Sequence, residues 1–101
     1  MKHTEEEILE LVKKILNDLF SDLYKESDIE KVLYNEKKEL VRGENKGKIQ
    51  PCWIAIIKSL FDSTDFLVIS DKTGEPVYIQ GKYITSEIGK DSEGNYYRKE
   101  N

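Results

Sequence analysis

Few of the side chains that usually carry out catalysis occur in this chain of 101 residues. His3 is the only histidine and Cys52 is the only cysteine. A thiolate activated by an imidazole could act as a nucleophile, but His3 precedes the first predicted helix and Cys52 lies in a predicted strand. We therefore expect His3 to be exposed to solvent and the two side chains to lie apart. One cysteine and one histidine are also too few for the usual set of zinc ligands, so no zinc site is predicted.

The other candidates for chemistry are the acidic residues that flank a predicted hairpin: Asp62, Asp65, Asp71 and Glu75. Paired carboxylates could hydrolyse a glycoside or bind a hard cation. Asp71, however, opens the turn Asp71–Gly74, where an aspartate can accept hydrogen bonds from the backbone ahead of it and a glycine can adopt a positive φ. Neither this turn nor Asp91–Gly94 has the alternating acidic residues of an EF-hand loop, and no phosphate-binding glycine motif occurs. The sequence therefore predicts no catalytic residue, no metal and no cofactor.

The elements that would position these residues indicate one α+β domain over residues 1–101. A helix is predicted at about residues 4–24, because apolar residues recur at intervals of three and four from Ile8 to Leu23. Thr4 and Glu7 have the spacing of a capping box at its start. The apolar stripe is wide, which is typical of a helix that covers a sheet. We expect this sheet to occupy residues from about 30 to 99, as four to five antiparallel strands in largely meander order.

The segment after the helix leaves two alternatives open. Ser27 with Glu30 is a second capping-box pattern and could start a short helix that ends near Leu33. Residues 31–34 and 39–42 have instead the composition of short strands. We favour at least one strand in this segment.

The C-terminal half is predicted to form a hairpin and further strands. The apolar runs Phe66–Ile69 and Val77–Ile79 are joined by the turn Asp71–Gly74. Residues 82–88 either extend the second of these strands or form another. Residues 95–98 are predicted to form a short last strand at an edge of the sheet.

Residues 51–60 are predicted to form a strand that is apolar on both faces. Its two faces alternate along the chain: Cys52, Ile54 and Ile56 on one, and Trp53, Ala55 and Ile57 on the other. An antiparallel strand often has one face in water. The second face is therefore either covered by the chain itself or used as an interaction surface.

Composition narrows the classes of partner and compartment. The formal net charge is −4, a poor match for a nucleic-acid binder or for a protein that binds anionic membranes. Acidity favours a basic protein partner. The lone cysteine allows no internal disulfide, which favours a reducing compartment, and neither an export signal nor an apolar run long enough to span a bilayer is evident. We predict a cytoplasmic protein with no nucleic-acid and no membrane partner.

The order of these motifs resembles a known family. The strand that carries Trp53 is followed by an apolar strand that ends in Ser70-Asp71-Lys72-Thr73-Gly74-Glu75-Pro76-Val77. Together with the N-terminal helix, this resembles the small α+β immunity proteins that bacteria encode beside polymorphic toxins, in which a tryptophan-bearing strand precedes a valine-aspartate-x-x-threonine-glycine-glutamate hairpin. PepSY-type propeptide domains share the Asp-x-x-Thr-Gly-Glu turn.

The resemblance implies a protein that inhibits a toxin by binding it, without catalysis of its own. We predict a non-enzymatic protein-binding domain whose partner is a basic toxin domain. The candidate interaction residues are Trp53, Asp62, Asp65 and Tyr78. Two alternatives stay open: a ligand-binding or enzymatic domain with a cavity between helix and sheet, and a structural subunit of a homo-oligomer such as a homodimer.

Overall fold

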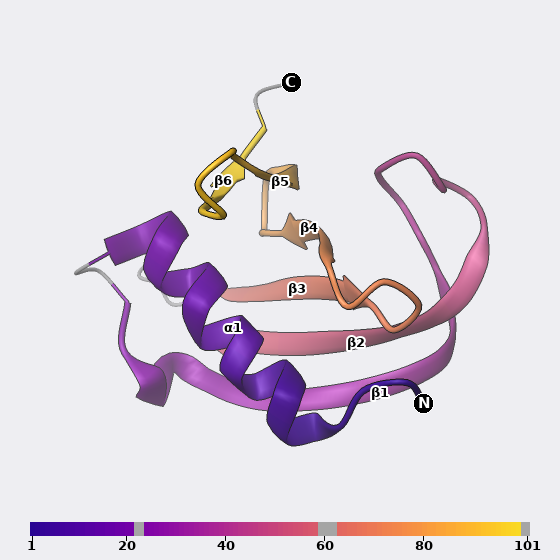
Figure 1. Ribbon diagram of the computed structural model, residues 1–101, viewed down its shortest axis with the longest axis horizontal. Coiled ribbons are helices and arrows are strands. Elements are labelled where there is room, and N and C mark those ends of the chain that lie inside the picture. The colour runs from indigo at the N-terminus through magenta and orange to yellow at the C-terminus, as the bar shows by residue number, and fades with distance from the viewer. Residues whose placement is uncertain (22–23, 59–62, 100–101) are drawn as a thin grey trace.

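The computed structural model describes residues 1–21, 24–58 and 63–99, and Figure 1 shows how their elements are arranged. The elements are α1 (Glu5–Phe20), the 3-10 helix η2 (Glu26–Asp28), β1 (Ile29–Glu39), β2 (Ile49–Lys58), β3 (Thr64–Ser70), β4 (Pro76–Gln80), β5 (Thr85–Lys90) and β6 (Tyr96–Arg98). The strands form one antiparallel sheet in the order β1-β2-β3-β4-β5-β6. The predicted α+β class and meander order are confirmed, but the sheet has six strands rather than four to five.

The additional strand comes from the residues that follow β4. The Gly81 N–H donates to the Ile84 carbonyl at 2.8 Å, and this turn reverses the chain. Residues 85–90 therefore form a separate strand, β5, instead of extending β4. The predicted short last strand is β6, which pairs with β5 at the edge of the sheet.

Residues 29–39 form the long strand β1, and only a single helical turn precedes it. The Lys25 N–H donates to the Asp28 carboxylate at 3.2 Å, and only the three-residue η2 follows. Of the two alternatives left open for this segment, the helix capped by Ser27 and Glu30 does not form, and the favoured strand is confirmed as β1. β1 instead pairs along β2, with irregular register in its polar stretch. Pairing with an apolar neighbour strand outweighs a local helical signal of this strength.

Helix α1 is shorter than predicted. Its start is as expected, because the Glu7 N–H donates to the Thr4 hydroxyl at 3.2 Å and the Thr4 N–H donates to the Glu7 carboxylate at 3.1 Å. The helix ends at Phe20 rather than near residue 24, since Ser21 adopts a φ of 48°, which helical backbone cannot have. Leu23, predicted to lie on the apolar stripe, is outside the described residues.

The main core lies between α1 and one face of the sheet. In Figure 1, α1 crosses β1, β2 and β3, and the later strands rise towards the end of the helix. The Tyr96 N–H of β6 donates to the Asp18 carboxylate of α1 at 3.0 Å, which joins the last strand to the helix. The buried core residues are Ile8, Val12, Ile15, Leu16, Val32, Trp53, Ala55, Ile57, Leu67, Ile69, Ile79, Ile88 and Tyr96. The apolar stripe of the helix thus covers this protein's own sheet.

The opposite face of the sheet carries a second, smaller apolar cluster. Its buried members are Leu40, Cys52, Val68 and Tyr78. The division of β2 into two apolar faces is therefore confirmed, with Trp53, Ala55 and Ile57 in the main core and Cys52 in the second cluster. The second cluster covers only part of its face, so the same strand is buried on one side and partly open on the other.

The core predicts a clear difference between two leucine-sized positions of α1. Ile15 is fully buried, whereas Leu9 is only partly buried at the edge of the core. We expect Ile15→Ala to lower the free energy of unfolding by about 2–5 kcal/mol, the range for a large-to-small substitution in a packed core. Leu9→Ala, the matched control, should cost clearly less. Urea unfolding measures both, and equal losses would contradict this packing.

Candidate functional site

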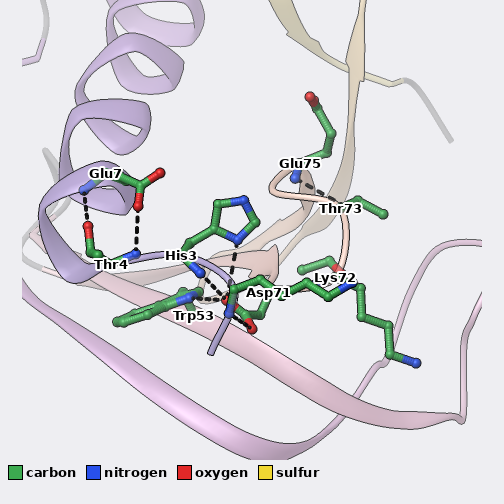
Figure 2. A network of polar contacts seen from close by, with 10 residues as sticks. His3, Thr4, Glu7, Trp53, Asp71, Lys72, Thr73 and Glu75 are labelled. Atoms are coloured by element: carbon green, nitrogen blue, oxygen red, sulfur yellow. Dashed lines mark hydrogen bonds and ion pairs between the residues drawn. The ribbon is translucent and has the colours of Figure 1, made fainter.

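The most connected polar group is the carboxylate of Asp71, which Figure 2 shows at close range. It accepts hydrogen bonds from the backbone N–H of Lys2 at 2.8 Å, the backbone N–H of His3 at 3.2 Å and the indole N–H of Trp53 at 2.9 Å. His3 Nδ1 lies 3.4 Å from the same carboxylate. Only 4% of the Asp71 side chain is exposed. We call these four residues the Asp71 clasp, because they fasten the segment before α1 to β2 and to the end of β3.

The turn after β3 is closed by hydrogen bonds to Ser70 and not by the Asp71 side chain. The Gly74 N–H donates to the Ser70 carbonyl at 2.8 Å, and the Lys72 N–H donates to the Ser70 hydroxyl at 3.2 Å. Gly74 has the predicted positive φ, 72°. The expectation that Asp71 would bond to its own turn is therefore wrong, because Ser70 takes that role and frees the carboxylate to reach the N-terminal segment.

The turn Asp91–Gly94, which also begins with aspartate and ends with glycine, has the predicted structure. Asp91 accepts hydrogen bonds from the backbone N–H groups of Glu93 and Asn95, both at 2.9 Å. Gly94 adopts a φ of 86°. The two aspartates therefore have different roles. Asp91 accepts hydrogen bonds from its own turn, whereas Asp71 accepts them from the distant N-terminal segment.

The clasp keeps Asp71 ionised. Burial raises the pKa of Asp71, but the hydrogen bonds from Lys2, Trp53 and His3 together outweigh burial and hold the pKa below its usual range. His3 is also not the exposed residue that we expected, since only 26% of its side chain is accessible. The backbone N–H groups of Lys2 and His3 and the His3 ring all contact the buried Asp71 carboxylate, so the N-terminal segment is anchored to the sheet.

His3 and Asp71 form the histidine–carboxylate pair that also occurs in catalytic triads. Their surroundings favour a structural role for this pair. His3 Nε2 lies against Gly74, where a Cβ atom would come within 2.6 Å of it. The helix-side cavity and two shallower ones described by the structure are lined by other side chains. The ring nitrogen that would act as a base therefore faces the backbone of Gly74 and lines none of these cavities.

Cys52 has the properties of a core residue. Its side chain is buried in the second cluster, and burial raises the pKa of its thiol to about 11. A thiol with this pKa is protonated at neutral pH and is a poor nucleophile. His3 contacts Asp71 on the other side of the sheet's central strands, so the two residues do not form a dyad.

An apolar strip remains accessible on the face of the sheet opposite α1. Leu33 of β1 pairs with Ile54 of β2, and Ile56 of β2 pairs with Phe66 of β3, so the four side chains are neighbours on one face. Leu33 is 41% exposed and Phe66 is 38% exposed, while Ile54 and Ile56 are half-buried. We call these four residues the open apolar face.

A cavity of about 650 Å³ lies on the helix side of the sheet, at the C-terminal end of α1. Leu16 and Phe20 of α1 line it from above, and Ile57 and Ile79 line it from the sheet. Asp65 contributes a carboxylate to the same wall. We call this space the helix-end cavity.

The four residues predicted for protein interaction do not form one surface. Trp53 is 3% exposed and bonded to Asp71, and Tyr78 is fully buried in the second cluster. Asp65 lines the helix-end cavity, and Asp62 lies outside the described residues. Trp53 and Tyr78 therefore stabilise the two cores of the folded chain, and neither side chain is available on its surface.

The open apolar face adds two residues, Leu33 and Phe66, that sequence reasoning missed. Ile54 and Ile56 were marked by the alternation of β2. Leu33 lies in residues 31–34, one of the two stretches with the composition of a strand, but only the pairing of β1 with β2 places it beside Ile54. Phe66 follows from the alternation of β3, because it faces away from the buried Leu67.

Searches for a metal site, a membrane helix and similar proteins add no further assignment. Among the described residues, no group of three or more His, Cys, Asp or Glu side chains could hold a metal ion. Within the same ranges, no helix is long and apolar enough to cross a membrane. Comparison with protein families, curated proteins and solved structures gave no match.

The clasp predicts how stability depends on pH. A carboxylate with a depressed pKa favours the folded state above its unfolded pKa, about 3.9, and loses this contribution as pH falls through the folded pKa. We expect Asp71→Asn to lower the free energy of unfolding at pH 7 by about 1–3 kcal/mol, since buried donors lose a charged acceptor. The difference from wild type should shrink below pH 4.

Thermal or urea unfolding between pH 2 and 7 measures this effect. Asp91→Asn is the matched control, because its carboxylate bonds only to its own exposed turn. It should cost less and show a weaker dependence on pH. A pH-independent difference between wild type and Asp71→Asn would contradict the role assigned to the clasp.

Proposed function

We propose that this chain is a non-enzymatic protein-binding domain that uses the open apolar face to bind its partner. The single observation that carries the proposal is the accessibility of Leu33 and Phe66 beside Ile54 and Ile56 on one face of the sheet. A sheet face in contact with water is normally polar. Four adjacent apolar side chains on such a face are a candidate core for an interface.

The surroundings of this face suit a protein partner. Lys31 pairs with Ile56 in register, and Lys58 pairs with Thr64, so polar side chains lie beside the apolar strip. Lys31, Lys58 and Thr64 are all exposed. An apolar centre with a polar, hydrated rim is the usual anatomy of a protein–protein interface.

The class of partner follows from the resemblance and from the charge of the whole chain. The likeness to immunity proteins supports a toxin domain as the partner. The net charge of −4 would steer a basic partner towards the molecule over long range. Because lysines border the open apolar face, the contact itself would depend on apolar burial, and acidity would act mainly on the rate of encounter.

Binding of a toxin encoded beside this chain tests the proposal. We expect co-purification with that protein and protection of cells that produce it. Leu33→Ser with Phe66→Ser should weaken binding more than tenfold, since each apolar anchor of an interface contributes on the order of 2 kcal/mol. Isothermal titration calorimetry measures the affinity. The melting temperature should change little, because both side chains are already partly exposed.

Ile49→Ser is the matched control. Ile49 is 63% exposed and lies at the other end of β2 from Ile56, so its replacement removes apolar surface outside the proposed face. Equal effects of the control and the double variant would count against this face. A dimer in light scattering that only the double variant dissociates would assign the face to self-association and contradict a toxin partner.

A further inference from the structure

The helix-end cavity has the size and the walls of a small-molecule site. Its volume of about 650 Å³ lies within the range of about 300–1,000 Å³ that is usual for such sites. Phe20 lies above it and Ile57 and Ile79 lie below it. Tyr83 and Ile84, at its mouth, are 87% and 64% exposed. Large apolar side chains that are exposed beside an apolar cavity are candidates to close over a ligand.

Asp65 is the carboxylate on the sheet side of the cavity, which Asp28 and Ser63 also line. It pairs with Ile57 in register, so its side chain lies on the face of the sheet that α1 covers. Within the described ranges it has no hydrogen-bond donor, and its one electrostatic partner is Arg98. Burial raises the pKa of Asp65, which the positive charge of Arg98 only partly opposes. A half-buried carboxylate without a donor is costly to the fold.

A second polar atom in the same wall is also without a partner among the described residues. The hydroxyl of Tyr24, which lines the cavity, is buried and has no hydrogen bond there. Buried polar groups normally have partners. A half-buried carboxylate with no donor and a buried hydroxyl with no partner, both among the described residues, would suit a ligand that brings a hydrogen-bond donor into this apolar cavity.

The positive groups of the cavity lie at its exposed rim. Lys58, Lys82 and Arg98 line the cavity and are all exposed, and the Arg98 guanidinium lies 5.4 Å from the centre of the Phe20 ring. Water can solvate these cations without a ligand. The group that most needs a partner is therefore the carboxylate on the floor, and a carboxylate is satisfied best by a charged donor.

We propose that the helix-end cavity binds a small amine with an apolar, ring-sized body. The body would lie between Phe20 and the floor of Ile57 and Ile79, and the ammonium would donate to Asp65, with the Tyr24 hydroxyl as a second acceptor. This site uses none of the four residues of the open apolar face, although Lys58 at the end of β2 borders that face and also lines the cavity. Its test is therefore independent of the proposed protein partner.

The probe is 2-phenylethylamine, followed by amide chemical shifts in ¹H–¹⁵N NMR spectra. We expect saturable shifts at Ile57, Asp65 and Gly81, which surround the floor of the cavity. The matched probe 3-phenylpropionate, with the same ring and the opposite charge, should bind at least tenfold more weakly. No saturable shift with the amine, or binding of the carboxylate with equal or greater affinity, would overturn the proposal.

Two variants separate a binding role from a structural one. Asp65→Asn should weaken binding of 2-phenylethylamine about tenfold or more, while its melting temperature stays at or above that of wild type, since a neutral amide replaces a half-buried carboxylate that has no hydrogen-bond donor among the described residues. Tyr24→Phe deletes only the hydroxyl and should give a smaller loss of affinity. Unchanged affinity in Asp65→Asn would overturn the assignment of the ammonium site, and unchanged affinity in both variants would overturn the orientation of the amine.

Discussion

The burial of one charged group, the carboxylate of Asp71, constrains the rest of this fold. An ionised carboxylate is stable beneath the surface only if donors surround it. Three N–H groups do so, from Lys2, His3 and Trp53. Two of them belong to the segment before α1, and one belongs to the central strand β2. The requirement to satisfy one charge therefore fixes where the helix begins relative to the sheet.

The two ends of α1 are held differently as a result. At its start, the capping box at Thr4 and the Asp71 clasp leave few backbone donors unsatisfied. At its other end, the helical backbone ends at Ser21, and Phe20, which packs against the edge of the main core, also lines the helix-end cavity. Binding sites tend to occur where packing is incomplete. The polar, closed end of the helix thus supports the fold, and the apolar, open end offers space for a ligand.

The sheet shows a similar division between its faces. β2 is apolar on both sides, and α1 can cover only one of them. Leu40, Val68 and Tyr78 cover part of the second side around Cys52. Leu33 and Phe66 lie beyond that cluster and remain accessible. One helix is too little to bury a six-stranded sheet with two apolar faces, which is the physical reason for proposing a protein partner on the uncovered side.

Features set by local chemistry were predictable from the sequence. The capping box of α1, the alternation of β2 and the positive φ of Gly74 all follow from short-range rules. A strand in the segment after the helix was favoured and is confirmed as β1, but its extent over Ile29–Glu39 did not follow from the sequence, because pairing with β2 decides it. The end of α1 at Ser21 also escaped prediction, since no glycine or proline marks it.

The candidate sites were less predictable than the fold. Asp71 and Asp91 both begin turns of the pattern Asp-x-x-Gly, and only the position of the N-terminal segment distinguishes their roles. Trp53 and Tyr78 are residue types that are common at interfaces, but Trp53 is buried in the main core under α1 and Tyr78 is buried in the second cluster on the opposite face. Asp65 was singled out from the sequence for a surface role, whereas its register opposite Ile57 places it in a cavity. Long-range packing decides each of these cases.

A double-mutant cycle of Asp71→Asn and Trp53→Phe tests the central claim most directly, because it isolates the bond between the buried carboxylate and the core indole. If this bond helps to unite the N-terminal segment, β2 and the hairpin, the two substitutions should be strongly coupled. We predict an interaction free energy of about 1–3 kcal/mol from urea unfolding at pH 7. Free energies that add within about 0.5 kcal/mol would contradict the account.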